Sequence, residues 1–280
     1  MKNKEYSVVI ASIGRSCLNV TLNDIIYSSK LPGEVIIVLP HKSEFVLEKK
    51  YEECGVKINL LYANKGQVKQ RNVGLLNCNF NIIVQLDDDI RFNTKLLECL
   101  VNEVSKNHKR VVAPLFFNRD LICKTGTEVT RNIFLRFIFG ADSEKESLSM
   151  GYISKIGLAM RPSFQICNNL IHSDWLPGGC MAYHKQFAEV DTHFLSPEGK
   201  FYGEDIINTY HMKDKGAELF FATKLNVYTE FGSPLKIKDV FSHFKSMIYI
   251  QKMTRHEHNY SKTLLFCFLR LLNQIRNRSY

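Results

Sequence analysis

The sequence predicts an α/β protein with a Rossmann-like, mostly parallel sheet flanked by helices. In the first half of the chain, short apolar runs alternate with stretches of about 10 to 15 residues that have helical periodicity. This alternation is typical of βαβ units, whose strands lie parallel and are buried on both faces. Three adjacent acids directly after one of these runs also indicate a ligand site at the carboxyl edge of the sheet.

Five runs in the first half are predicted strands, and predicted helices separate them. Each run is rich in Val, Ile and Leu and is bounded by Gly, Pro or polar residues. The predicted strands are residues 6–11, 34–39, 56–61, 82–86 and 110–114. The predicted helices run from the turn at residues 12–15 to about residue 29, and over residues 43–53, 66–76 and 93–106.

The second half has a less regular pattern. Residues 116–169 mix aromatic, basic and acidic side chains without a clear period, so we expect irregular structure there. A turn and a strand are predicted over residues 175–183. A helix is predicted over residues 202–213, where acids in the first turn suit the helix dipole, and a strand over residues 218–228. The remainder, from residue 236, is mainly helical.

The composition is that of an ordinary globular protein. Of the 280 residues, 45% are hydrophobic and 23% are charged. The eight cysteines are scattered without a C-x-x-C pair, which indicates reduced thiols in a cytoplasmic protein rather than disulfides. The first predicted strand begins soon after Met1, so we expect no signal peptide. No apolar run reaches the roughly 18 to 20 residues that cross a bilayer.

Positive charge is concentrated near the C-terminus. The net charge is +9, and residues 236–280 carry nine Lys or Arg against two acids, which leaves +7 in this segment. We therefore predict an α/β domain over residues 1–235 and a basic helical extension over residues 236–280. Residues 261–278 combine an apolar-rich stretch with flanking cations, which is typical of a helix lying on a membrane surface. The alternatives are a helix packed on the domain and, less favoured, a nucleic-acid-binding segment.

The three adjacent acids are Asp87, Asp88 and Asp89, directly after the predicted strand over residues 82–86. Because side chains alternate along an extended chain, Asp87 and Asp89 should point one way and Asp88 the other. Two converging carboxylates suit Mg²⁺ or Mn²⁺, which commonly bridge carboxylates to phosphates. The alternative is a polar turn that caps the next helix. The carboxyl-edge position favours the metal site.

Five motifs, in order along the chain, resemble the family 2 glycosyltransferases of the GT-A fold. The first is the strand Val8-Val-Ile-Ala-Ser12 with Gly14 and Arg15. Residues 64–74 are similar to the family's N-x-G-x-x-x-A-R-N-x-G segment, with Gln70 where the family often has Ala. The remaining motifs are the D-x-D at residues 87–89, the acceptor-side loop at 175–179 and the Gly-Glu-Asp at 203–205. The resemblance covers about residues 6–231.

The resemblance implies a donor side that binds a nucleotide sugar and a divalent cation. Asp87 is expected to contact the ribose and to coordinate Mn²⁺ or Mg²⁺ together with Asp89. Glu230 is the candidate third metal ligand, where the family often has a His, and His243 is its alternative. The candidate nucleotide-binding residues are Ser12, Arg15, Arg71, Asn72, Asp87 and Asp88, with the Arg71 guanidinium suited to phosphate or base.

The resemblance also implies a catalytic pair and an acceptor side. Asp205 is the candidate general base, and repulsion from the adjacent Glu204 would raise its pKa. No second carboxylate is arranged as a covalent nucleophile, which favours inversion at the transferred sugar. Acceptor binding is expected from Trp175, Gly178 and Gly179, since an aromatic ring beside a glycine turn can stack on a sugar. The alternative for a single tryptophan is a place in the core.

One departure from the family pattern concerns the nucleotide. The second strand of the family normally ends in an Asp that helps to read the base and ribose, whereas this chain has Leu39-Pro40-His41 there. UDP is the expected nucleotide.

Taken together, the expected activity is metal-dependent, inverting transfer of a sugar from a nucleotide sugar to a glycan or lipid-linked acceptor in cell-surface polysaccharide biosynthesis. We expect a cytoplasmic protein, peripheral at the inner face of the cell membrane, that binds no nucleic acid. One alternative is a sugar nucleotidyltransferase of related fold, although residues 12–15 lack the Gly-rich phosphate loop that it would need. The other is a non-catalytic basic module that binds membrane or nucleic acid.

Overall fold

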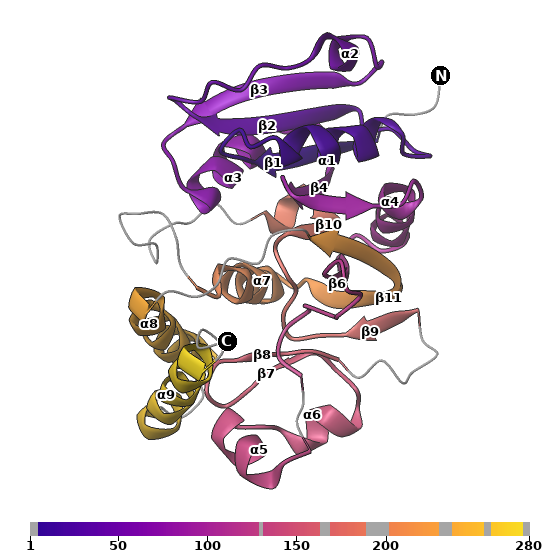
Figure 1. The fold of residues 1–280 in the computed structure, drawn as a ribbon. Helices are drawn as coiled ribbons and strands as arrows, with labels where there is room; N and C mark the ends of the chain where they lie inside the picture. The colour runs from indigo at the N-terminus through magenta and orange to yellow at the C-terminus, as the bar shows by residue number, and fades with distance from the viewer. Residues whose placement is uncertain are drawn as a thin grey trace.

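Figure 1 shows the computed structural model, which describes residues 5–128, 131–162, 169–188, 202–229, 237–254 and 259–276. A central sheet has helices on both faces, and the two C-terminal helices lie beside a small subdomain at the lower end of the view. The main sheet contains β1 (Tyr6–Ala11), β2 (Glu34–Pro40), β3 (Lys57–Ala63), β4 (Ile82–Asp87), β5 (Ile90–Phe92), β6 (Arg110–Phe117), β9 (Leu170–His172), β10 (Cys180–His184) and β11 (Glu218–Thr229). The small subdomain contains the paired strands β7 (Tyr152–Ile153) and β8 (Ala159–Met160).

The helices vary in length from single turns to five turns. They are α1 (Cys17–Ile26), α2 (Lys49–Glu52), α3 (Gln67–Leu76), α4 (Leu96–Lys106), α5 (Ile133–Phe139), α6 (Ser143–Ser147), α7 (Glu204–Asp214), α8 (Ile237–Met253) and α9 (Tyr260–Arg276). All five strands predicted in the first half are present. The helix predicted over residues 43–53 was wrong in length, because Ser43 forms a turn with Pro40 and Phe45 and only α2 is helical.

The strand order brings several strand ends to one edge of the sheet. The order is β3-β2-β1-β4-β10-β6-β11-β5, with β9 pairing to β11. Strands β1 to β4 are mutually parallel, and β10 runs antiparallel to both β4 and β6. The carboxyl ends of β1, β4 and β6 therefore meet the start of β10 at the same edge.

The core consists of two apolar layers on the two faces of the sheet. Along β1, Val8 and Ile10 join one layer and Val9 joins the other, as the strand period of two requires. Helices α1, α2 and α4 cover the first layer, and α3 and α7 cover the second. Parallel strands buried on both faces explain why their sequences read as continuous apolar runs.

The stretch after β6 was expected to be irregular, and that expectation was wrong for residues 133–160. It contains α5, α6 and the β7–β8 pair. The Asn132 side chain accepts the Leu135 N–H at the start of α5, and Asp142 accepts two N–H groups at the start of α6. These elements are too short to show a period in the sequence.

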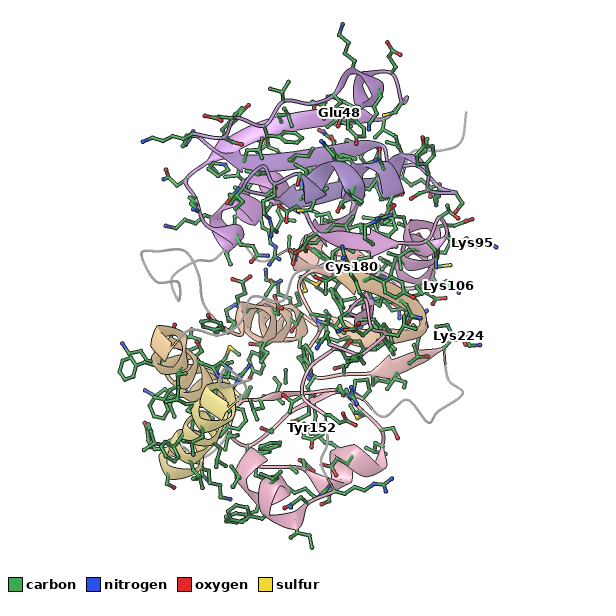
Figure 2. The ribbon with its side chains drawn as sticks, viewed as in Figure 1. Glu48, Lys95, Lys106, Tyr152, Cys180 and Lys224 are labelled. Atoms are coloured by element: carbon green, nitrogen blue, oxygen red, sulfur yellow. The ribbon has the colours of Figure 1, made fainter. Side chains whose placement is uncertain are left out.

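The C-terminal helices pack against this small subdomain. Ile138, Tyr152 and Met160 form an apolar cluster with Met247 of α8 and Phe266 of α9. Tyr152 marks this cluster in Figure 2. Among the described helices, none is both long enough and apolar enough to span a membrane.

A pH dependence of stability follows from the packing of α8 on α9. His243 lies between the Tyr202 and Phe266 rings, with Nδ1 3.3 Å from a terminal nitrogen of Arg270. Burial, and then the Arg270 charge, lowers the pKa of His243 to about 4. As the pH falls, the unfolded chain takes up the proton first, so stability is lost between the ordinary pKa of 6.5 and the folded value of about 4.

We therefore predict that the stability advantage of wild type over His243→Gln shrinks by about 1 to 2 kcal/mol between roughly pH 7.5 and 4.5. Urea unfolding at a series of pH values measures this difference. The exposed His41→Gln variant is the control and should track wild type. A His243→Gln difference that is constant across this pH range would contradict the prediction.

Candidate functional site

The candidate site lies at the sheet edge where β1 and β4 end and β10 begins. Ala11 of β1 is in register with Asp87 of β4, so the loop after β1 lies next to the acids. Cys180, the first residue of β10, pairs with Leu86 on the other side of β4. Figure 2 shows Cys180 near the middle of the molecule. The topology thus gathers residues 12–15, 87–89 and 175–179 at one place.

Asp88 is buried and holds the loop after β1. Its carboxylate accepts hydrogen bonds from Ser12 Oγ at 2.5 Å and from Arg15 at 2.5 Å. The Ser12 hydroxyl also accepts the Gly14 N–H at 2.9 Å, which fixes the turn. Ser12 and Arg15, both predicted to bind nucleotide, are therefore joined to the acid cluster through Asp88.

Asp87 faces α3 and the loop before β10. Its Oδ1 accepts hydrogen bonds from Arg71 at 2.6 Å and from Gln67 Nε2 at 2.8 Å. Its backbone N–H donates to the Gly179 carbonyl at 2.7 Å. Asp87 thus connects three of the motifs found in the sequence.

Asp89 makes fewer side-chain hydrogen bonds than Asp87 and Asp88, and its pKa is raised. Its Oδ2 lies 3.6 Å from a terminal nitrogen of Arg15. Burial, followed by the charges of Asp87 and Asp88, raises the pKa of Asp89 to about 6. Carboxylates that repel one another in a partly buried place are a donor set that a divalent cation would stabilise.

Arg71 lies at the centre of the site and is 6% exposed. It bonds Asp87 at 2.6 Å and Glu204 at 3.1 Å, and it lies 4.0 Å from Asp205. We expected this guanidinium to meet phosphate or base, but in the structure both terminal nitrogens contact carboxylates. Its neighbour Asn72 is also buried on α3.

The catalytic candidates stand in the first turn of α7. Gly203, at φ +84°, precedes the helix in a conformation that favours glycine. Glu204 is paired to Arg71, whereas about a third of the Asp205 side chain is exposed. Burial, with a contribution from Asp87, raises the pKa of Asp205, although Arg71 and the Gly178 N–H act in the opposite direction. A carboxylate with a raised pKa and partial access is suited to accept a proton.

Two adjacent glycines allow the loop before β10 to pass close to both sets of carboxylates. A Cβ on Gly178 would lie 2.2 Å from Asp205 Oδ1, and one on Gly179 would lie 2.8 Å from Asp87 Oδ2. The Gly178 carbonyl also accepts the Gln85 side-chain N–H at 2.5 Å. No side chain fits at either position without displacing a carboxylate.

Trp175 does not present its ring to the site, which corrects the expectation of an exposed stacking surface. The residue is 4% exposed, its Nε1 donates to the Met160 carbonyl at 2.9 Å, and its ring meets Phe221 edge-on. Trp175 therefore lies in the core, which was the alternative to stacking on a sugar. The reason is that the ring joins the sheet to the small subdomain around β8.

The third metal ligand is not placed by the structure. Glu230 lies outside the described residues. His243 of α8 packs against Tyr202, which precedes α7, and against Phe266 of α9. Within the described ranges, no three His, Cys, Asp or Glu side chains are arranged to hold an ion together.

Three glutamines support the site and were missed as such in the sequence. Gln70 Nε2 donates to the Ser12 and Val38 carbonyls at 2.7 Å each, and its Oε1 accepts the Gly66 N–H. These buried hydrogen bonds explain why a Gln stands at a position where the family that the sequence resembles often has Ala. Gln67 binds Asp87, and Gln85 binds the Gly178 carbonyl. Gln85 could have been recognised from the sequence, since it is a polar residue within an apolar strand.

Comparison with solved structures identifies the fold. The structure of GalNAc-T7 with UDP, GalNAc and Mn²⁺ matches with a TM-score of 0.59 and 17% identity over 83% of this chain and 45% of that chain. The S. aureus TarS 1–349 complex with UDP-GlcNAc matches with a TM-score of 0.58 and 14% identity, over 92% of this chain and 69% of that one. This chain has the GT-A fold. A second TarS 1–349 structure gives a TM-score of 0.55 at 14% identity, over 96% and 71%.

The predicted GT-A fold is thus confirmed, and at these identities the likeness concerns the fold alone. The chain spans less than half the length of the GalNAc-T7 chain. No family model matches the sequence, and no curated protein matches it. The resemblance to family 2 stays a prediction.

The central position of Arg71 leads to a stability prediction. Arg71→Met would leave Asp87 and Glu204 without their shared partner in a partly buried place, and we expect a loss of about 3 to 5 kcal/mol in unfolding free energy. Arg71→Lys should lose less, because it keeps the charge but not the fork that bridges two carboxylates. Urea unfolding at neutral pH measures both.

Arg91→Met provides the matched control. Arg91 pairs with Asp24 at 2.8 Å but is 44% exposed, so its loss should cost about 1 kcal/mol or less. If Arg71→Met cost no more than Arg91→Met, the central role of Arg71 would be refuted.

Proposed function

We propose that this protein is a metal-dependent, inverting glycosyltransferase that takes a sugar from a nucleotide sugar, with UDP as the expected nucleotide. The observation that carries the proposal is the joining of Asp87 to Glu204 and Asp205 through one buried guanidinium. This places the acids at the end of β4 beside a partly accessible carboxylate at the start of α7. The GT-A neighbours solved with UDP or UDP-GlcNAc support a nucleotide sugar as the donor.

The donor side would hold the cation and the nucleotide. Asp89, together with Asp87, would hold Mn²⁺ or Mg²⁺, and we propose Glu230 as a further ligand. When bound, the cation would neutralise charge on the departing nucleoside diphosphate. The structure of GalNAc-T7 with Mn²⁺ supports a divalent ion. Ser12, Arg15 and Asn72 lie on the loop and helix that border this edge and would contact the nucleotide.

The acceptor side would carry the base. Asp205 would take the proton from the acceptor hydroxyl, whose oxygen attacks the anomeric carbon opposite the diphosphate, so that the new bond forms with inversion. Glu204 would pair with Arg71 and hold that residue in place. Gly178 and Gly179 would border the acceptor with backbone groups, since they let the loop pass close to Asp205 and Asp87.

The acceptor class and location are part of the proposal. The acceptor would be a glycan or a lipid-linked molecule of cell-surface polysaccharide biosynthesis. The protein would meet this acceptor while lying at the inner face of the cell membrane. The net charge of +7 in residues 236–280 supports a location at an anionic surface.

The test is a panel of nucleotide sugars with Mn²⁺ or Mg²⁺, scored by thermal shift and by donor hydrolysis. We expect stabilisation by a UDP-sugar that depends on the metal. Asp89→Asn should abolish the metal dependence of this shift, and Asp205→Asn should keep the shift while turnover falls about 10²- to 10⁴-fold. The exposed Asp120→Asn is the control and should match wild type.

Two outcomes would count against the proposal. If no nucleotide sugar stabilised the protein with or without metal, the transferase assignment would fail. If Asp89→Asn and Asp205→Asn both turned over like wild type, the non-catalytic alternative would be favoured.

A further inference from the structure

Large apolar side chains are exposed on two helices at the lower end of the molecule. On α5, Ile133 is 83% exposed, and Phe134 and Phe137 are each 63% exposed. On α9, the exposed apolar residues are Leu264, Leu265, Phe268 and Leu272. We call these seven residues the α5–α9 surface. Such an apolar concentration on a protein surface marks a site of interaction.

Helix α9 is apolar on two opposite sides. Phe266 and Cys267 are buried and pack against the small subdomain and α8. Leu264, Phe268 and Leu272 follow one another at intervals of four residues, which places them along one stripe of the helix away from those buried residues. Among the residues that the structure describes, packing accounts for the first side, whereas the second side is exposed.

The two helices are neighbours, and their exposed apolar side chains lie at the same end of the molecule. The Phe139 ring of α5 and the Phe266 ring of α9 meet edge-on with centroids 5.4 Å apart. Lys262 Nζ of α9 lies 3.5 Å from the centroid of the exposed Phe137 ring. Figure 1 shows both helices at the same end of the molecule, at a distance from the strands that carry the candidate site.

Cations accompany the apolar side chains. Lys262 lies within the surface, and Lys245 of α8 lies over the ring of the exposed Phe241 at 4.9 Å. Residues 236–280 as a whole carry a net charge of +7. Apolar side chains with Lys and Arg beside them match the boundary between acyl chains and anionic headgroups.

We propose that the α5–α9 surface docks on the surface of an anionic lipid bilayer, with its apolar side chains at the acyl boundary and the cations at the headgroups. The inference rests on the peripheral location proposed above and adds to it that a helix within the α/β region, α5, shares the contact with the C-terminal extension. A second copy of the chain fits less well, because two such surfaces face to face would bring their positive charges together.

Vesicle co-sedimentation of the full-length protein tests the proposal, without nucleotide or acceptor. Vesicles of phosphatidylcholine alone are compared with vesicles that contain roughly 30% phosphatidylglycerol. We expect wild type to bind the anionic vesicles preferentially and to lose binding as NaCl increases. The double variants Phe134→Ser/Phe137→Ser and Leu264→Ser/Phe268→Ser should each reduce binding at least about tenfold.

The control is Tyr27→Ser/Val46→Ser, which removes two exposed apolar residues elsewhere and should bind like wild type. Circular dichroism confirms that each variant is folded, and the UDP-sugar thermal shift tests the donor site independently of lipid. Failure of wild type to bind would overturn the membrane location while leaving the transferase proposal intact.

Two further outcomes would overturn the α5–α9 surface itself. In one, only the α9 variant loses binding, so the C-terminal extension acts without α5. In the other, size-exclusion chromatography with light scattering shows a dimer that either double variant dissociates, which would assign the surface to a second copy.

Discussion

The site depends on one buried guanidinium. Arg71 of α3 binds Asp87 at the end of β4 and Glu204 at the start of α7, two elements more than 100 residues apart in the chain. Leaving either carboxylate unpaired in a partly buried place would be costly, so all three elements are held at fixed distances. The same contacts leave Asp205, next to Glu204, as the carboxylate of this pair with access to solvent. A single charge thus organises both sides of the proposed reaction.

Acids outnumber bases among the described residues at this edge. Asp87, Asp88, Asp89, Glu204 and Asp205 face the two guanidiniums of Arg15 and Arg71. Burial raises the pKa values of Asp89 and Asp205, and at Asp89 the neighbouring charges of Asp87 and Asp88 raise the pKa further. The excess negative charge makes the site a poor one for a nucleoside diphosphate alone and a good one for a diphosphate accompanied by a cation. Metal and donor would therefore be expected to bind together.

The parallel half of the fold could be predicted from the sequence, because burial on both faces leaves continuous runs of Val, Ile and Leu. The order of the motifs also brought Arg71, the three Asp and Asp205 to attention. Their contacts could not be predicted, because a motif gives a residue's place in the chain but not its partner. Trp175 shows the same limit. Neither its place in the chain nor the glycine turn that follows it reveals that its indole donates to the Met160 carbonyl. The short α5 and α6 depend on side-chain caps instead of periodicity.

The antiparallel direction of β10 makes the chain between β6 and β10 a segment that starts and ends at the same edge of the sheet. Because β6 ends and β10 begins at the same edge of the sheet, residues 118–179 leave that edge and return to it as one excursion. The excursion carries the small subdomain, Trp175 and both loop glycines, whereas Ser12, Arg71 and the three Asp precede it in the chain. Exchange of this segment would alter the surroundings of Asp205 and replace β9, while the order β3-β2-β1-β4-β10-β6-β11-β5 would be kept. The proposed donor residues and the loop that would border the acceptor therefore belong to separate stretches of the chain, although both meet at one edge of the sheet.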